Sequence, residues 1–179
     1  MIFIDMQGFK FQSNNEFIVK EVVIINSKSE GAYHHWLFDP PCAKDDLDFA
    51  DWTTAEWLTR NHHGLNWDSG VVPYAGVTDH FEHTLIRECE LDEPVLIYVT
   101  GHEKREWLRI LAPKFFSTRP EVQIIDIYDH YNIEASDYEK LPYRYYDCIH
   151  HENSRYKCAL RTIYYMAYIY ENLDHKEDQ

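Results

Sequence analysis

The chain of 179 residues is predicted to be an α/β protein, with a mixed five-stranded sheet (three antiparallel strands, then two parallel strands) flanked by helices. Segments rich in β-branched and aromatic residues come first, and segments with helical periodicity follow them. Two short apolar runs of the buried-strand type then alternate with helical segments. Hydrophobic residues make up 45% of the sequence, enough for one core. We expect one domain over residues 1–173 and a polar tail at 174–179.

The first three strands are predicted from residue type and from the breaks between them. They are residues 1–5 ("MIFID"), 17–26 ("FIVKEVVIIN") and 31–41 ("GAYHHWLFDPP"). The polar and glycine-containing breaks have the length of hairpin turns, which indicates antiparallel pairing.

Two helices are predicted next. Residues 51–64 form a short helix with Asp51 and Gly64 as caps. Residues 77–89 place apolar side chains on one face, at Val77, Phe81, Leu85 and Ile86. Most of the histidines of these two segments are expected at the surface: His62 and His63 end the first helix, and His80 and His83 share one surface of the second.

The remaining chain alternates strand and helix. "PVLIYVTG" (94–101) is a predicted strand, "EKREWLRIL" (103–111) a helix and "EVQIIDIYD" (121–129) a strand. The longest helix is predicted from about Ser154 to Leu173, with an apolar stripe repeating every three or four residues. Strands joined by helical crossovers predict the parallel part of the sheet.

The charge of the chain restricts its partners. Lysine and arginine number 17 against 31 aspartates and glutamates, a formal charge of −14 that repels a phosphate backbone over most of the surface. RNA binding would need a local basic patch. The densest basic region supplies the candidates, Lys104, Arg105, Arg109 and Lys114, although a solvated helix face would have the same composition.

Two further patterns concern location. No apolar run reaches the roughly 18 residues typical of a membrane span. The start "MIFIDMQGFKF" lacks the basic head and long apolar middle of a signal peptide. We therefore expect no membrane partner and an intracellular protein, cytoplasmic or nuclear.

The four cysteines are expected to be metal ligands or buried thiols and not disulfides, because the predicted compartment is reducing. Cys148 and His151 have C-x-x-H spacing, and Cys158 follows at the predicted start of the last helix, where the helix dipole favours a thiolate. His150 is an alternative ligand to His151. Burial of the thiols and exposure of both histidines is the competing interpretation. Cys42 and Cys89 have no nearby partner in sequence and are expected to be structural.

Glu21 interrupts an apolar strand face. Alternation along the second strand places it on the face of four apolar residues, Phe17, Val19, Val23 and Ile25. Burying an unpaired carboxylate costs several kcal/mol, by order of magnitude, so we expect a metal or a basic side chain to meet it.

Several segments resemble the 3′→5′ exonucleases of the RNase H-like fold. "FIDMQG" resembles their first motif, an apolar strand ending in Asp-x-Glu. "HHGLNWDSGVVPYAGVTDHF" resembles the Thr-Gly-Ile segment with its helix, and "IYVTGHEKREWL" occupies the place of their His-Asn-x-x-Phe-Asp motif. This resemblance implies an RNase H-like sheet over most of the chain.

The catalytic carboxylates of that family are largely missing. Two-metal chemistry needs several carboxylates around two divalent cations. Asp5 is present, but Gln7 stands in place of the motif glutamate and Cys158 in place of the third-motif aspartate. An amide and a thiol cannot replace the hard oxygen ligands of magnesium.

The sequence is also similar to the Maelstrom domain, a branch of this fold with a Glu-Cys-His-Cys zinc signature. "VKEVVIINSKSEGAYHHWLFDPP" and "CIHHENSRYKCAL" carry the similarity, and matching them residue by residue gives Glu21, Cys148, His151 and Cys158. The resemblance implies a structural zinc ion, a role in RNA binding or small-RNA silencing, and single-stranded ribonuclease activity in some members. The HMG box that usually accompanies the domain is missing from this sequence.

Two other functions fit the sequence. One is an active 3′→5′ exonuclease that uses magnesium or manganese at Asp5 with carboxylates such as Asp126. The other is a protein-interaction module without nucleic-acid contact, which the acidity and the many aromatic residues favour.

Overall fold

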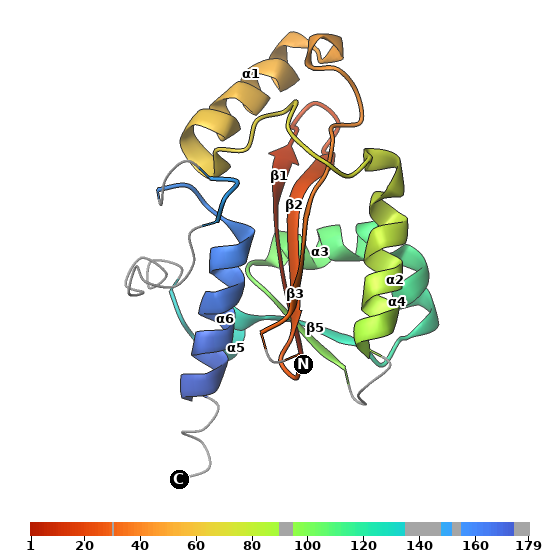
Figure 1. Ribbon diagram of the computed structural model, residues 1–179, viewed down its shortest axis with the longest axis vertical. Coiled ribbons are helices and arrows are strands. Elements are labelled where there is room, and N and C mark those ends of the chain that lie inside the picture. Colours follow the sequence, from red (N-terminus) through yellow and green to blue (C-terminus); the bar gives the residue numbers. More distant parts are fainter. Residues whose placement is uncertain (30, 90–94, 135–147, 152–154, 174–179) are drawn as a thin grey trace.

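The structure is a computed structural model that describes residues 1–29, 31–89, 95–134, 148–151 and 155–173 (Figure 1). The predicted tail at 174–179 and the predicted helix start at Ser154 lie outside these ranges. The elements of the described chain are β1 (Ile2–Lys10), β2 (Phe17–Asn26), β3 (Tyr33–Leu37), η1 (Lys44–Asp46), α1 (Phe49–Leu58), η2 (Thr59–His63), η3 (Tyr74–Gly76), α2 (Val77–Cys89), β4 (Leu96–Val99), α3 (His102–Leu111), α4 (Pro113–Thr118), β5 (Gln123–Asp126), α5 (Ile127–Tyr131) and α6 (Ala159–Leu173).

The five strands form one mixed sheet in the order β3-β2-β1-β4-β5. β1 pairs antiparallel with β2, and β2 pairs antiparallel with β3. β4 pairs parallel with both β1 and β5. The predicted α/β class, with three antiparallel and two parallel strands, is therefore confirmed.

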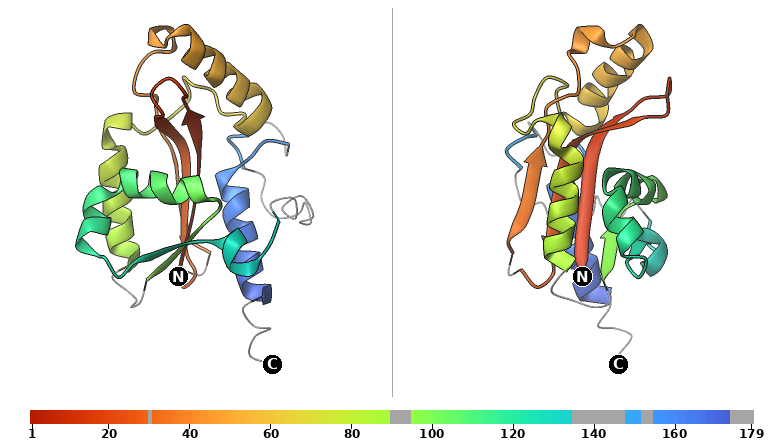
Figure 2. Two further views of the ribbon diagram at one scale, coloured as in Figure 1. Left: turned by 180° about the vertical axis from the view of Figure 1, so that it is seen from behind. Right: turned by 90° about the vertical axis from the view of Figure 1, so that its right-hand side faces the viewer.

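Helices cover both faces of the sheet (Figures 1 and 2). One face packs against α2, α3 and α4 through a core that includes Ile4, Val22 and Phe81. The other face packs against α6 through a core that includes Phe3, Val23 and Met166. Because each β1 and β2 side chain points to one side or the other, the two cores alternate along these strands.

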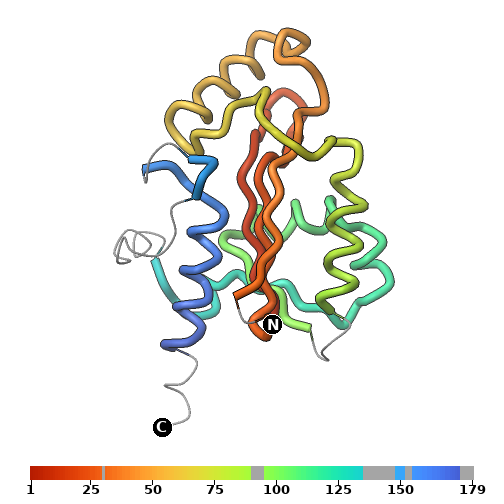
Figure 3. Tube along the Cα trace, in the orientation of Figure 1, coloured from red at the N-terminus to blue at the C-terminus, as the bar shows by residue number. Residues whose placement is uncertain are grey.

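α1 and the π-helical turn η2 lie across the end of the β1–β2 hairpin (Figure 3). Asp48 is the N-cap of α1, since its side chain accepts the N–H of Asp51, and Asp51 itself is therefore in the first turn. Gly64 ends η2 in the left-handed conformation, as expected for a C-terminal glycine. The expectation of a surface position for His63 is wrong: the residue is 0% exposed.

A bulge in β2 corrects the predicted alternation. Gln7 pairs with Glu21 whereas Gly8 pairs with Val19, so Lys20 is the extra residue. Val23 and Ile25 share the α6 face with Glu21, as predicted. Phe17 and Val19, beyond the bulge, pack with the opposite core.

The C-terminal half contains shorter strands and more helices than the sequence indicated. The strand expected over residues 121–129 ends at Asp126, whose side chain accepts the N–H of Tyr128 and begins α5. α4 follows Pro113, which is favoured in a first helical turn. Among the described residues, no helix is long and apolar enough to cross a membrane.

Candidate metal centre and the Asp5 cluster

Four side chains from distant parts of the chain meet beneath the start of α6. They are Glu21 on β2, Cys148 and His151 on the segment that precedes α6, and Cys158 immediately before its first residue. One ligand atom from each lies within 4.8 Å of the others. The structure thus brings together all four residues of the predicted metal site and places His151, not His150, in the cluster.

Glu21 anchors this cluster from the sheet. Its carboxylate is fully buried and accepts the backbone N–H of Ala159 at 3.0 Å. That contact places a negative charge at the N-terminus of α6, where the unpaired N–H groups and the helix dipole stabilise it. It also accounts for the helix beginning at Ala159.

His151 is oriented by a contact on its far side. Nδ1 lies 2.7 Å from the carbonyl oxygen of His63, which can only accept, so Nδ1 carries the proton. Nε2 therefore points into the cluster, 3.1 Å from Oε2 of Glu21. A ligating histidine is commonly fixed by such a hydrogen bond from its other nitrogen.

The cluster sets the charges of its members. Burial opposes ionisation of Glu21, but hydrogen bonds with His151, His35 and the Ala159 N–H hold its pKa at about 2. Burial also opposes a charged His151, yet contacts with Cys148 and Glu21 raise its pKa to about 9.

The pKa values of the two thiols, Cys148 and Cys158, are shifted in opposite directions. A hydrogen bond with Cys158 is the main cause that lowers the pKa of Cys148 to about 5. The same contact, together with burial, raises the pKa of Cys158 above its ordinary value. One thiolate is therefore already favoured among the four groups before any cation binds.

The geometry fits a small four-coordinate cation. Tetrahedral ligands at zinc distances lie about 3.3–3.8 Å from one another, so a separation within 4.8 Å requires only a small contraction. Two sulfurs, one imidazole nitrogen and one carboxylate oxygen form a donor set suited to a borderline-soft metal and unsuited to magnesium.

His35, which was not predicted as part of the site, supports the cluster from β3. Its Nε2 lies 2.9 Å from Oε1 of Glu21, and its ring contacts the ring of His150 with centroids 5.0 Å apart. The register pairs Val23 with His35, which puts the histidine beside Glu21 on the α6 face. Strand alternation could have suggested it only after the pairing was known.

Cys42 and Cys89 lie apart from this cluster. Cys89 is buried in the core under α2, as expected for a structural thiol, and burial raises its pKa to about 11. Cys42 is partly exposed.

Asp5 lies on the same sheet face, in a second buried polar cluster. The ammonium group of Lys104 contacts Oδ1 of Asp5, and the hydroxyl of Thr100 donates to the same oxygen at 3.0 Å. Gln7 donates to Oδ2 at 3.2 Å. Burial raises the pKa of Asp5 against the lowering effect of Lys104. A side-chain cation therefore occupies one side of the carboxylate.

Asp126, the other carboxylate considered for an exonuclease site, caps α5 through the N–H of Tyr128. In the described chain, the side chains that hydrogen-bond to Asp5 are those of Gln7, Thr100 and Lys104, and none of these is a carboxylate.

The four RNA-binding candidates do not form one patch of free charge. Lys104 is paired with Asp5, and Arg109 forms an ion pair with Glu106 at 2.7 Å. Arg105 contacts the ring of His102, and the exposed Lys114 lies on α4.

Comparisons of the chain with protein-family models, curated proteins and solved structures give no significant match.

Proposed function

We propose that this protein is a zinc-stabilised RNase H-like pseudo-exonuclease of the Maelstrom-like kind, acting in RNA binding or small-RNA silencing. The observation that carries the proposal is the Glu21, Cys148, His151 and Cys158 cluster, which has the residues and the order of that domain's signature. The strand order, with an antiparallel hairpin sheet extended by two parallel strands, is in accord with an RNase H-like fold.

The zinc ion would have a structural role. Four protein ligands fill a tetrahedral shell and leave no position for an activated water molecule. The ion would join β2 to the chain before α6. Glu21 and Cys148, one from each of these segments, are 127 residues apart in the sequence.

The loss of exonuclease chemistry is supported by the surroundings of Asp5. Lys104 provides the positive charge that a divalent cation would otherwise bring to this carboxylate. Gln7 is a neutral neighbour, and one carboxylate cannot hold two divalent ions. Any weak ribonuclease activity should therefore be independent of magnesium.

A salt titration with single-stranded RNA tests the nucleic-acid part of the proposal. We expect binding at low salt that weakens steeply as salt rises, because phosphate contacts release counterions. Cleavage should not increase when magnesium or manganese is added. Strong metal-dependent cleavage that disappears in Asp5→Asn would instead establish an active exonuclease.

Exposed aromatic residues on α1 support a second candidate, a protein-interaction module. Phe49 is 83% exposed and Trp57 is 58% exposed. Protein interfaces are enriched in aromatic side chains of this kind. The same titration separates the candidates, since an interaction module would show no affinity for RNA at low salt.

A further inference from the structure

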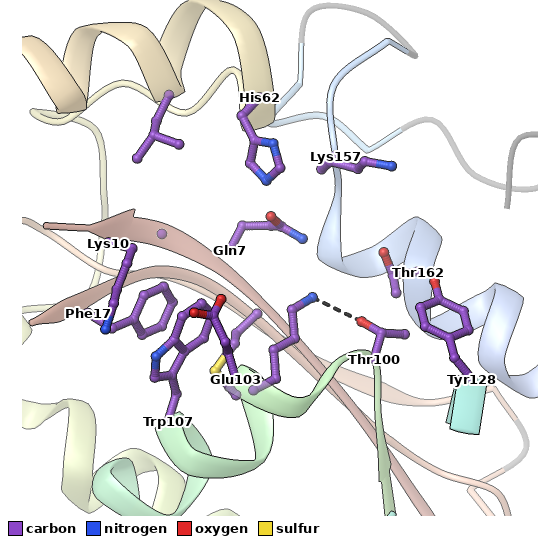
Figure 4. A pocket seen from close by; sticks show the side chains of 14 residues that line it. Gln7, Lys10, Phe17, His62, Thr100, Glu103, Trp107, Tyr128, Lys157 and Thr162 are labelled. Atoms are coloured by element: carbon purple, nitrogen blue, oxygen red, sulfur yellow. Dashed lines mark hydrogen bonds between the residues drawn. The ribbon is translucent and has the colours of Figure 1, made fainter. Parts of the chain in front are cut away.

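A cavity of about 360 Å³ opens beside the Asp5 cluster (Figure 4). Its walls come from β1, β2, the end of α1 with η2, the start of α3, α5, and the chain around the start of α6. Pockets for small ligands span about 300–1,000 Å³, so this one has room for a single small molecule and not for a long polymer segment.

Three lysines from separate segments line this cavity, although the chain carries a net charge of −14. They are Lys10 on β1, Lys104 on α3 and Lys157 before α6. Glu103 is the acidic side chain at the same wall. Lys104 is paired with Asp5, so Lys10 and Lys157 against Glu103 leave the lining with a small excess of positive charge on a protein that is acidic overall.

Lys104 has donor capacity beyond its contacts with the protein. An ammonium group carries three N–H donors. Within the described chain, its hydrogen-bond partners are Asp5 and Thr100, the latter at 3.0 Å. One donor is left for a ligand in the cavity that Lys104 lines.

The opposite end of the cavity is aromatic. The rings of Phe17 and Trp107 stack with centroids 3.7 Å apart and planes 4° from parallel, and both rings line the cavity. Figure 4 shows them on the far side of Gln7 from His62 and Lys157. Lys10 lies beside this pair, with its Nζ 6.0 Å from the centroid of the Trp107 ring. The cavity therefore has Lys157 and His62 at one end, and the aromatic pair with Lys10 at the other.

The positive potential is apparent at His62. Burial lowers the pKa of this imidazole, and the charges of Lys157 and Lys104 lower it further. The backbone N–H of Lys157 donates to the carbonyl of His62 at 2.8 Å, so these two wall residues are held together.

We propose that this cavity binds one nucleotide unit of single-stranded RNA without a divalent cation, with a phosphate toward Lys104 and Lys157 and a base against Trp107. This assignment rests on the proposed RNA binding and names the surface and the unit recognised. Lys104 meets both Asp5 and the phosphate, and the site therefore needs no bridging metal. A base with a flat aromatic face matches the Phe17–Trp107 wall.

The test measures binding of adenosine and uridine monophosphate, and of a short single-stranded RNA, in buffer without added magnesium or manganese. Lys157→Met should weaken RNA binding and reduce the slope of log affinity against log salt by about 1. Trp107→Leu should weaken it about tenfold through lost stacking. Glu103→Gln should strengthen it, because it removes a negative charge from the wall.

Lys28→Met is the matched control, since Lys28 is an exposed lysine in the β2–β3 turn and does not line the cavity. Thermal melting and zinc content of each variant identify any loss that comes from unfolding, and Glu103→Gln adds a gain that unfolding cannot produce.

The outcomes separate the inference from the proposed function. RNA binding that is unchanged in Lys157→Met, Trp107→Leu and Glu103→Gln would overturn the cavity assignment and leave RNA binding intact. Mononucleotide binding that responds to these variants, without RNA binding, would support the cavity and contradict the RNA function. No binding of either ligand would overturn both.

Discussion

Glu21 is the residue of the candidate metal centre that comes from the sheet, whereas the other three come from the chain before α6. Its place on an apolar strand predicted a buried partner, and the structure supplies Cys148, His151 and the N–H of Ala159. The expectation held for the α6 face because Val23 and Ile25 continue the alternation. It failed at Phe17 and Val19, since no local signal marks Lys20 as a bulge.

The ion-pair partner of Lys104 could not be predicted from the sequence. The lysine was identified as part of a basic region, but its partner Asp5 is 99 residues away in the chain. The parallel pairing of β1 with β4 brings the start of α3, which carries Lys104, next to Asp5 on β1. The cavity beside it could not be foreseen for the same reason.

Gln7→Glu tests whether the exonuclease site is lost. Gln7 lies opposite Glu21 and donates to Asp5, so a third carboxylate here should repel both and lower stability. We expect no magnesium-dependent cleavage, because the other metal ligands remain absent. Measurement of RNA cleavage with and without magnesium checks this, and strong cleavage by the single variant would mean that further carboxylates reach the site.

His63 should make stability depend on pH. Burial, followed by the charges of His62 and His151, lowers its pKa from 6.5 to about 3. Below pH 6.5 the unfolded chain takes up a proton that the folded protein refuses, so stability falls with pH down to about 3. The slope within this window approaches about 1.4 kcal/mol per pH unit.

His63→Gln should remove that contribution while keeping an acceptor for the N–H of Leu65. Urea unfolding of both proteins between pH 7 and pH 5 measures the difference. Parallel curves would show that His63 titrates normally in the folded protein.

Among the elements, η2 ends at Gly64, which packs against the ring of Tyr156 in the chain before α6. Its φ is +70°, and an added Cβ would lie 2.5 Å from the ring of Tyr156. Gly64→Ala should therefore destabilise through both backbone strain and a clash, by more than the roughly 1–2 kcal/mol of strain alone.

Gly31→Ala is the control for this prediction. Gly31 has a φ of +85° but no heavy atom within 4 Å of an added Cβ, so only the backbone cost applies. The free energy of unfolding of the two variants, from urea titrations, gives the clash as a difference. Equal losses would show that the ring of Tyr156 does not pack there.

The predicted elements differ in how far the sequence could define them. α2 was predicted over its full length because its apolar residues repeat at helical spacing. Val77, Phe81 and Leu85 are buried as expected, whereas Ile86, expected on the same face, is 37% exposed. α5 was missed because "IIDIYD" continues an apolar pattern, and only the cap at Asp126 ends the strand. A short side chain such as that of Asp126 can cap a helix through a local hydrogen bond. Whether the cap forms or the strand continues depends on pairing with a distant strand, which the local sequence does not show.

For the whole molecule, the candidate zinc centre joins the sheet, η2 and α6. Glu21 belongs to the sheet, the His63 carbonyl to η2, and Cys158 to the start of α6. The class of the fold could be predicted, since strand patterns and helical patterns are local. The four residues of the cluster were predicted from the C-x-x-H pair, from Glu21 on an apolar strand face and from the resemblance to the Maelstrom domain. The contacts that support them, from His35 and His63, depend on the tertiary structure.

A site absent from the unfolded chain contributes its binding energy to folding, so loss of the metal should lower stability. Cys158→Ser and prolonged chelation are both expected to decrease the melting temperature markedly. Cys42→Ser is the control, because Cys42 is a partly exposed thiol outside the cluster. A decrease equal to that of the control would argue against a metal at Cys158.

Elemental analysis of the purified protein tests the central claim most directly. We predict close to one equivalent of zinc per chain, which Cys148→Ser and Cys158→Ser reduce and Cys42→Ser leaves unchanged. A well-folded protein that contains no zinc, with stability indifferent to both Cys148→Ser and Cys158→Ser, would contradict the zinc centre and the Maelstrom-like function built on it.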